Sequence, residues 1–193
     1  SQWQPFAVVG VTIVVLLMCM SLAAPRIGTA MTAILIGTTP LFSAVLGRIF
    51  GSERTSMMGL LGLVLGLGGV ALLVGFPAVP VTLSFVLGSA SALVAAFASA
   101  YGGTYARRSL AHTGSWEVSI GSFGFGGVMM LPLLFAVPVV VTPAPIDYFY
   151  LLILGCVMSA LCYVIYYQLI FDIGATRTSS VEFPVTLVAV LIG

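Results

Sequence analysis

Long apolar runs, separated by a few charged residues, dominate this sequence and leave it few ways to fold. Only 6% of its 193 residues are charged and 61% are hydrophobic. A soluble domain carries about a quarter charged residues, because most of its surface meets water. An α-helix needs about twenty apolar residues to cross the hydrocarbon of a bilayer. The sequence therefore predicts an all-α, polytopic membrane protein whose surroundings are the lipid bilayer.

The sequence has few residues that could form a nucleic-acid, metal or cofactor site. All the basic residues are arginines and they form no basic patch, which excludes nucleic acid as a partner. Cys19, Cys156 and Cys162 lie inside apolar runs, and His112 lies in a polar loop without a second ligand at a suitable spacing. We therefore expect no metal site and no cofactor.

Seven apolar segments are candidates to span the bilayer, and the loops between them are too short to hold a soluble domain. The predicted spans are 5–24, 28–47, 56–75, 81–106, 118–141, 148–171 and 178–193. The chain begins without a methionine, and no polar loop follows the seventh span. We therefore expect both ends to be cuts in a longer protein.

The arginines predict an orientation, because basic residues in short loops collect on the cytoplasmic side of a membrane. Loops alternate sides along the chain, and only Arg26 falls on the side opposite to the other arginines. We expect a multi-pass protein of the cell inner membrane. Its cytoplasmic loops would carry Arg48 and Arg54, Arg107 and Arg108, and Arg177.

Small residues repeat every four positions in the fourth predicted span. They are Ser84, Gly88, Ala92, Ala96, Ala100 and Thr104. Small side chains let helix backbones approach closely in lipid, so this stripe predicts a helix-packing face. The glycines of the third and fifth spans favour the same interpretation over a ligand-binding role.

Two segments of twenty-one residues, beginning at Ile27 and Ile173, match at five positions. They belong to the second and the seventh span, so the repeating unit would contain five helices. An odd number of helices places two copies in opposite orientations, as in the inverted repeats of many secondary transporters. We expect 1–75 to be the last three helices of one truncated unit, 76–80 a joint, and 81–193 the first four helices of the other.

Each of these two segments also carries a proline inside its predicted span, Pro40 and Pro184. Proline leaves a helix carbonyl without its usual donor, and interrupted helices at matching places often mark a transporter's binding site. Hydroxyl groups of Thr38, Thr39 and Ser180 lie nearby. The segments could line a site, or they could be kinks whose carbonyls these hydroxyls satisfy.

Glu182 is the only acidic residue well inside a predicted span. A carboxylate in hydrocarbon is costly and should face a cavity or a partner. It could couple transport to protons or contact a cationic group of a substrate. It could instead lie near the interface and pair with Arg177. The nearby tyrosines, Tyr163, Tyr166 and Tyr167, favour an aromatic belt at the membrane surface over a substrate platform.

The segment 37–75 resembles EamA-type members of the drug/metabolite transporter superfamily. Pro40, Glu53–Arg54 and Gly69–Val70 follow the family's order, except that Ser52 separates Gly51 from Glu53. The segment beginning Ile173–Gly174–Ala175–Thr176–Arg177 resembles the second copy of the same unit. Members of this family have ten helices, and the resemblance covers the third to the ninth of them. It implies two inverted five-helix units around a central cavity that moves small metabolites.

The sequence and the resemblance together predict a carrier, working as an exporter of small metabolites such as amino acids or drugs by alternating access. A proton is the candidate coupling ion. The alternatives are a membrane-embedded enzyme and a channel or structural membrane subunit. We expect no enzymatic activity, because the other acidic residues lie in separate loops and would not assemble a reaction centre. The candidate site residues are Thr38, Thr39, Pro40, Ser180, Glu182 and Pro184.

Overall fold

The computed structural model describes residues 3–51, 57–74, 82–136 and 144–184, and every regular element among them is helical. The all-α prediction is therefore confirmed for these residues. The elements are α1 (Trp3–Ile27), α2 (Thr29–Ile36), α3 (Thr39–Ile49), α4 (Met57–Val74), α5 (Leu83–Ser109), α6 (Ser115–Ala136), α7 (Pro145–Leu152), the π-helix η1 (Ile153–Ser159), α8 (Ala160–Ile173) and α9 (Ala175–Ser179).

Four helical stretches among the described residues are long and apolar enough to cross a membrane. They are Trp3–Ile27, Thr29–Ile49, Leu83–Ser109 and Pro145–Ile173. These correspond to the first, second, fourth and sixth predicted spans. The described parts of the third and fifth predicted spans lie in α4 and α6. Most of the seventh lies outside the described residues, so the total of seven remains a prediction.

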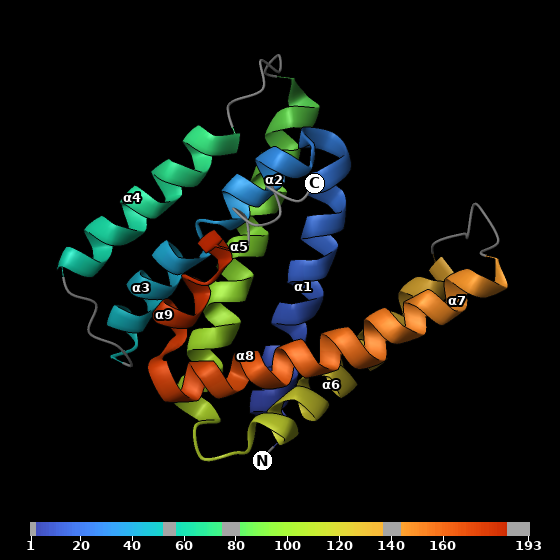
Figure 1. Cartoon of the computed structure of the whole chain (residues 1–193). Helices are drawn as coiled ribbons and strands as arrows, with labels where there is room; N and C mark the ends of the chain where they lie inside the picture. Colours follow the sequence, from blue (N-terminus) through green and yellow to red (C-terminus); the bar gives the residue numbers. More distant parts are fainter. Residues whose placement is uncertain (1–2, 52–56, 75–81, 137–143, 185–193) are drawn as a thin grey trace.

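Helix α5 lies at the centre and packs most extensively against α1 (Figure 1). The two helices run antiparallel, because Gly102 of α5 lies against Thr12 whereas Gly88 lies against Ile27. The predicted stripe is buried along this helix from Gly88 to Thr104, and only Ser84 is exposed. Small side chains thus bring the α5 backbone close to its neighbours, as lipid-embedded helices require.

Two separate groups of buried side chains hold the opposite ends of α1. Near its N-terminus, Val9 and Ile13 pack with residues of α5, α6, α8 and α9. Near its C-terminus, Ala23 and Ile27 pack with Ala92 of α5. The middle of α1 lies between these two cores, and this is where its side chains reach a cavity.

The remaining helices lie on either side of the α1–α5 pair. Helix α6 and the continuous run from α7 to α8 extend to one side, and α4 lies on the other (Figure 1). Helix α1 crosses α6 at Gly10, where a Cβ atom would lie only 2.7 Å from the Ser122 carbonyl oxygen. Glycine is therefore needed for this backbone approach.

The C-terminal ends of α3, α5 and α8 meet at one end of the molecule (Figure 1). Arg107 donates a hydrogen bond of 2.6 Å to the Ile170 carbonyl oxygen. The Arg108 guanidinium lies 5.7 Å from the centroid of the Phe50 ring. These contacts join segments that are distant in the sequence.

Candidate functional site

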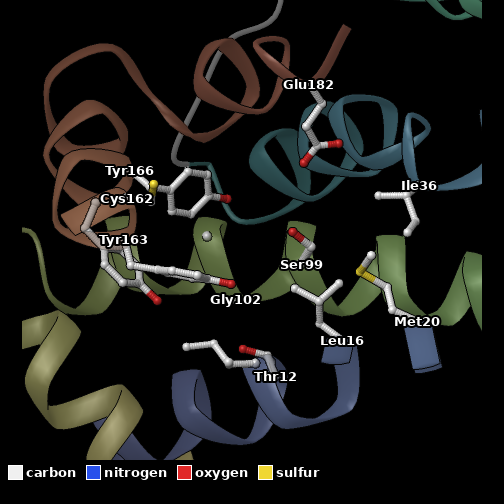
Figure 2. A pocket seen from close by; sticks show the side chains of 13 residues that line it. Thr12, Leu16, Met20, Ile36, Ser99, Gly102, Cys162, Tyr163, Tyr166 and Glu182 are labelled. Atoms are coloured by element: carbon white, nitrogen blue, oxygen red, sulfur yellow. The ribbon is translucent and has the colours of Figure 1, made fainter. Parts of the chain in front are cut away.

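A cavity of about 380 Å³ lies between α1, α5, α8 and the segment that follows α9 (Figure 2). Its walls are largely apolar, with Leu16, Met20 and Ile36 among them. Polar groups enter from three directions. Thr12 comes from α1, Ser99 from α5, and the tyrosines from α8. The lining residues are Thr12, Ile13, Leu16, Met20, Ile36, Ser99, Gly102, Gly103, Cys162, Tyr163, Tyr166, Tyr167 and Glu182.

A second cavity of about 440 Å³ adjoins the first one and extends along α2. Four residues line both cavities, namely Met20, Ile36, Tyr166 and Glu182. We call these four residues the shared wall. The polar side chains of the shared wall therefore stand where the two cavities meet, within reach of a molecule in either one.

The second predicted span is interrupted between α2 and α3, at Gly37 and Thr38. Pro40 lies directly after this break, in the first turn of α3. The first turn tolerates proline, because its N–H groups have no helical acceptor. The Thr39 hydroxyl donates a 2.6 Å hydrogen bond to the Ile36 carbonyl oxygen, and Thr38 donates one of 2.6 Å to Leu35.

A second interruption follows α9, at Ser180 and Val181, and helical geometry resumes over 182–184. The Ser180 hydroxyl donates a 2.9 Å hydrogen bond back to the Thr176 carbonyl oxygen. The Ser180 carbonyl accepts a 3.2 Å bond from the Phe183 amide. Pro184 lies in this short helical turn and is exposed. Hydroxyl groups therefore serve the backbone at both interruptions.

Glu182 projects its carboxyl group from the second interruption into the cavity (Figure 2). The carboxyl group lies beside the Thr39 hydroxyl at the start of α3. One turn away, the hydroxyls of Ser43 and Ser179 lie 3.3 Å apart in a buried contact. The two interrupted segments thus touch each other directly beside the cavity.

Three tyrosines of α8 form one side of the first cavity. The ring centroids of Tyr163 and Tyr166 are 5.9 Å apart, and those of Tyr166 and Tyr167 are 5.7 Å apart. The Tyr166 hydroxyl has Ser99 and Ser179 as hydrogen-bonding partners. The hydroxyls of Tyr163 and Tyr166 point into the cavity (Figure 2). The sequence favoured an aromatic belt at the membrane surface for these tyrosines, whereas in the structure they line the cavity.

Of the six predicted site residues, only Glu182 lines the cavities. Glu182 lines both cavities, and Thr39 contacts it. Thr38 and Ser180 bond to nearby carbonyls, Pro40 is fully buried, and Pro184 is exposed. The sequence reasoning missed Thr12, Ser99 and the tyrosines. The one available signal was the spacing of Tyr163, Tyr166 and Tyr167, which puts them on one helix face.

Glu182 is the only charged side chain among the described residues that line these cavities. Its surroundings are aliphatic, aromatic and hydroxyl groups, so the site offers one acidic group and several neutral hydrogen-bonding groups. Such a site can bind a small molecule through apolar contact and orient it by one charge.

The chain matches the model of the EamA-like transporter family over residues 86–193, which is more than half of its length. Neither the curated proteins nor the solved structures contain a match to this sequence.

Proposed function

Because the chain belongs to the EamA-like transporter family and is a membrane transporter of the drug/metabolite type, we propose that it is a carrier that works as an exporter of small metabolites. It moves them through the cavities at the shared wall by alternating access. The observation that carries this proposal is the meeting of the two interrupted helical segments at these cavities. Interrupted helices around a central site are the usual binding architecture of secondary transporters.

The proposed inverted repeat draws support from matching local geometry. Helix α1 ends at Ile27 before Gly28, with φ 80° and ψ 159°, and α8 ends at Ile173 before Gly174, with φ 101° and ψ 156°. Thr32 donates a 2.7 Å hydrogen bond to the Gly28 carbonyl. Thr178 donates a 2.8 Å bond to the Gly174 carbonyl. Two segments with the matching sequences thus begin in the same way.

The direction of the two segments also supports the repeat. Ser43 contacts Ser179, whereas Thr39, which comes earlier in the chain, contacts Glu182, which comes later. The segments that begin at Gly28 and Gly174 therefore run antiparallel where they touch. Antiparallel copies are what a five-helix unit inserted twice from opposite sides would give. The family match over 86–193 lies close to the proposed second unit, 81–193.

The proposed orientation rests on the grouping of arginines. The ends of α3, α5 and α8 gather at one end of the molecule, and Arg48, Arg107 and Arg108 lie there (Figure 1). Arg177 lies in α9, which follows α8 directly. This end of the molecule would face the cytoplasm, because short loops that carry basic residues are retained on the cytoplasmic side of the inner membrane.

Transport by the full-length protein in liposomes tests the carrier function. The experiment measures the initial rate of uptake of radiolabelled small metabolites against their concentration, with and without a pH gradient. A carrier gives a saturable rate, and a proton-coupled carrier gives a rate that the gradient changes. A rate that rises without saturation would indicate a channel, and a chemically altered product would indicate an enzyme.

A further inference from the structure

We infer that the cavities around Glu182 select an organic cation, namely an amine with an apolar body, over the amino acid or carboxylic acid of the same shape. This inference rests on the proposed carrier function, because it names the class of substrate for that site. It follows from the charge, the aromatic groups and the size of the two cavities.

The charge of the site favours a cation. Glu182 is the only charged side chain among the described lining residues, and neither cavity is lined by a described arginine or histidine. Of the undescribed segments, 75–81, 137–143 and 185–193 contain no charged residue in the sequence, whereas 52–56 contains Glu53 and Arg54. An ammonium group would pair with the Glu182 carboxylate through a charge-assisted hydrogen bond. A substrate carboxylate would meet no counter-charge among the described lining residues, and burying such a group without one is costly.

The aromatic wall favours the same class of ligand. Tyr163 and Tyr166 line the first cavity together with Glu182, and their ring centroids lie 5.9 Å apart. An ammonium group is attracted to the face of an aromatic ring within about 6 Å of its centroid. Figure 2 shows the tyrosine side chains on one side of the cavity and Glu182 above it. A cation in the cavity can therefore meet the Glu182 carboxylate and the tyrosine side chains.

The dimensions and the apolar walls fit the rest of such a ligand. The two cavities measure about 380 and 440 Å³. Sites for small molecules range from about 300 to 1,000 Å³ and are mostly apolar. Leu16, Met20 and Ile36 offer apolar contact next to Glu182. An amine bound at the shared wall would place its hydrocarbon part in one cavity or the other.

Three probes with the same phenyl body separate the possible head groups. They are phenethylamine, phenylalanine and 3-phenylpropionate, and their equilibrium binding to the purified full-length protein is measured by titration calorimetry at neutral pH. We expect phenethylamine to bind at least about tenfold more tightly than the other two. Equal or tighter binding of the amino acid or the carboxylate would overturn the inference. So would absence of amine binding by protein that is folded and monodisperse.

Variants then assign the selectivity to the proposed groups. Glu182→Gln should weaken phenethylamine binding at least about tenfold, and Glu182→Asp should restore part of it. Glu117→Gln removes the same charge from an exposed position on α6 and is the matched control. Tyr163→Leu should weaken binding more than Tyr163→Phe, which keeps the ring. Wild-type affinity in folded Glu182→Gln protein would refute the role of this carboxylate and with it the inference.

Binding and transport fail in different ways, so the two proposals can be told apart. Binding of the amine without any saturable flux would contradict the carrier function and support the ligand assignment. Flux of a zwitterion or an anion, without binding of the amine, would support the carrier function and overturn the ligand assignment.

Discussion

The Glu182 carboxyl group lies where two cavities meet, and it contacts Thr39 of the other interrupted segment. An ionisable group within a membrane-spanning segment is costly and usually serves an ion or substrate pathway. Its position on the shared wall is one that a substrate in either cavity would contact. We therefore propose that it acts in transport, by contacting the substrate or by carrying a proton.

Replacing this carboxyl group should impair transport without preventing insertion of the protein. We expect Glu182→Gln to lower the initial rate of flux at least about tenfold at equal protein level in the membrane, since a charge-assisted contact is lost. Liposome uptake with protein quantified by immunoblot measures this, with Glu117→Gln as the control. An unchanged rate would remove Glu182 from the mechanism.

At the scale of single residues, the sequence pointed to Glu182 because an acid in a long apolar run stands out. The tyrosines do not stand out in the same way. An aromatic belt and an aromatic cavity wall have the same composition, and only the packing of α8 beside α1 and α5 separates them. Thr39 was singled out through its neighbour Pro40. Its contact with Glu182 depends on tertiary structure that no local pattern contains.

Among the elements, the crossing of α1 and α6 depends on the lack of a side chain at Gly10. A Cβ atom there would lie 2.7 Å from the Ser122 carbonyl oxygen and 3.1 Å from the Gly126 amide nitrogen. Both atoms belong to the backbone, which cannot move aside as a flexible side chain can. Close backbone packing of this kind is a main source of helix association in lipid.

Adding one methyl group at this crossing should therefore destabilise the protein. We expect Gly10→Ala to cost about 1–3 kcal/mol, as overpacking does, and to lower the thermal unfolding midpoint in detergent by several degrees. Gly124→Ala on α6 is the control, because nothing described lies within 4 Å of a Cβ atom there. Equal midpoints for the two variants would contradict the proposed packing.

The glycines that precede α2 and α9 give a second test at this scale. Gly28 and Gly174 have φ values of 80° and 101°, with extended ψ values that residues with a side chain rarely adopt. We expect Gly28→Ala and Gly174→Ala each to cost about 1–3 kcal/mol. Gly155→Ala in η1 should cost less, because its φ is not positive and nothing described lies within 4 Å.

Thermal unfolding of the three purified variants measures this difference. Unfolding midpoints close to wild type for both Gly28→Ala and Gly174→Ala would show that neither position requires glycine. A large loss for only one of them would argue against equivalent roles in the two proposed units.

The sequence predicted the bounds of the long helices more closely than the positions at which helices are interrupted. Apolar runs are long and continuous, so α1, α5 and the run from α7 to α8 were located to within a few residues. The stripe on α5 was also correct from Gly88 onwards. Pro40 marked the interrupted segment, and the break lies directly before it, at Gly37 and Thr38. Hydroxyl bonds to backbone carbonyls are present there, from Thr38 to Leu35 and from Thr39 to Ile36.

At the scale of the whole molecule, we propose two five-helix units in opposite orientations around the two cavities that meet at the shared wall. The antiparallel contact between α3 and the segment around α9 supports this arrangement, as do the matching turns at Gly28 and Gly174. A chain with one orientation for both units would not bring these two segments together in this way. The topology of the loops in the membrane follows directly from the arrangement.

Labelling of single cysteines tests this topology most directly. The native Cys19, Cys156 and Cys162 are free and can be replaced first. Cysteine is then placed at one of four exposed positions, Arg26, Arg48, His112 or Asp147, in the full-length protein. An impermeant maleimide is applied to right-side-out and inverted membrane vesicles. We predict that positions 48 and 112 react from the cytoplasmic side and positions 26 and 147 from the other. Reaction of positions 48 and 112 from opposite sides would contradict the inverted repeat.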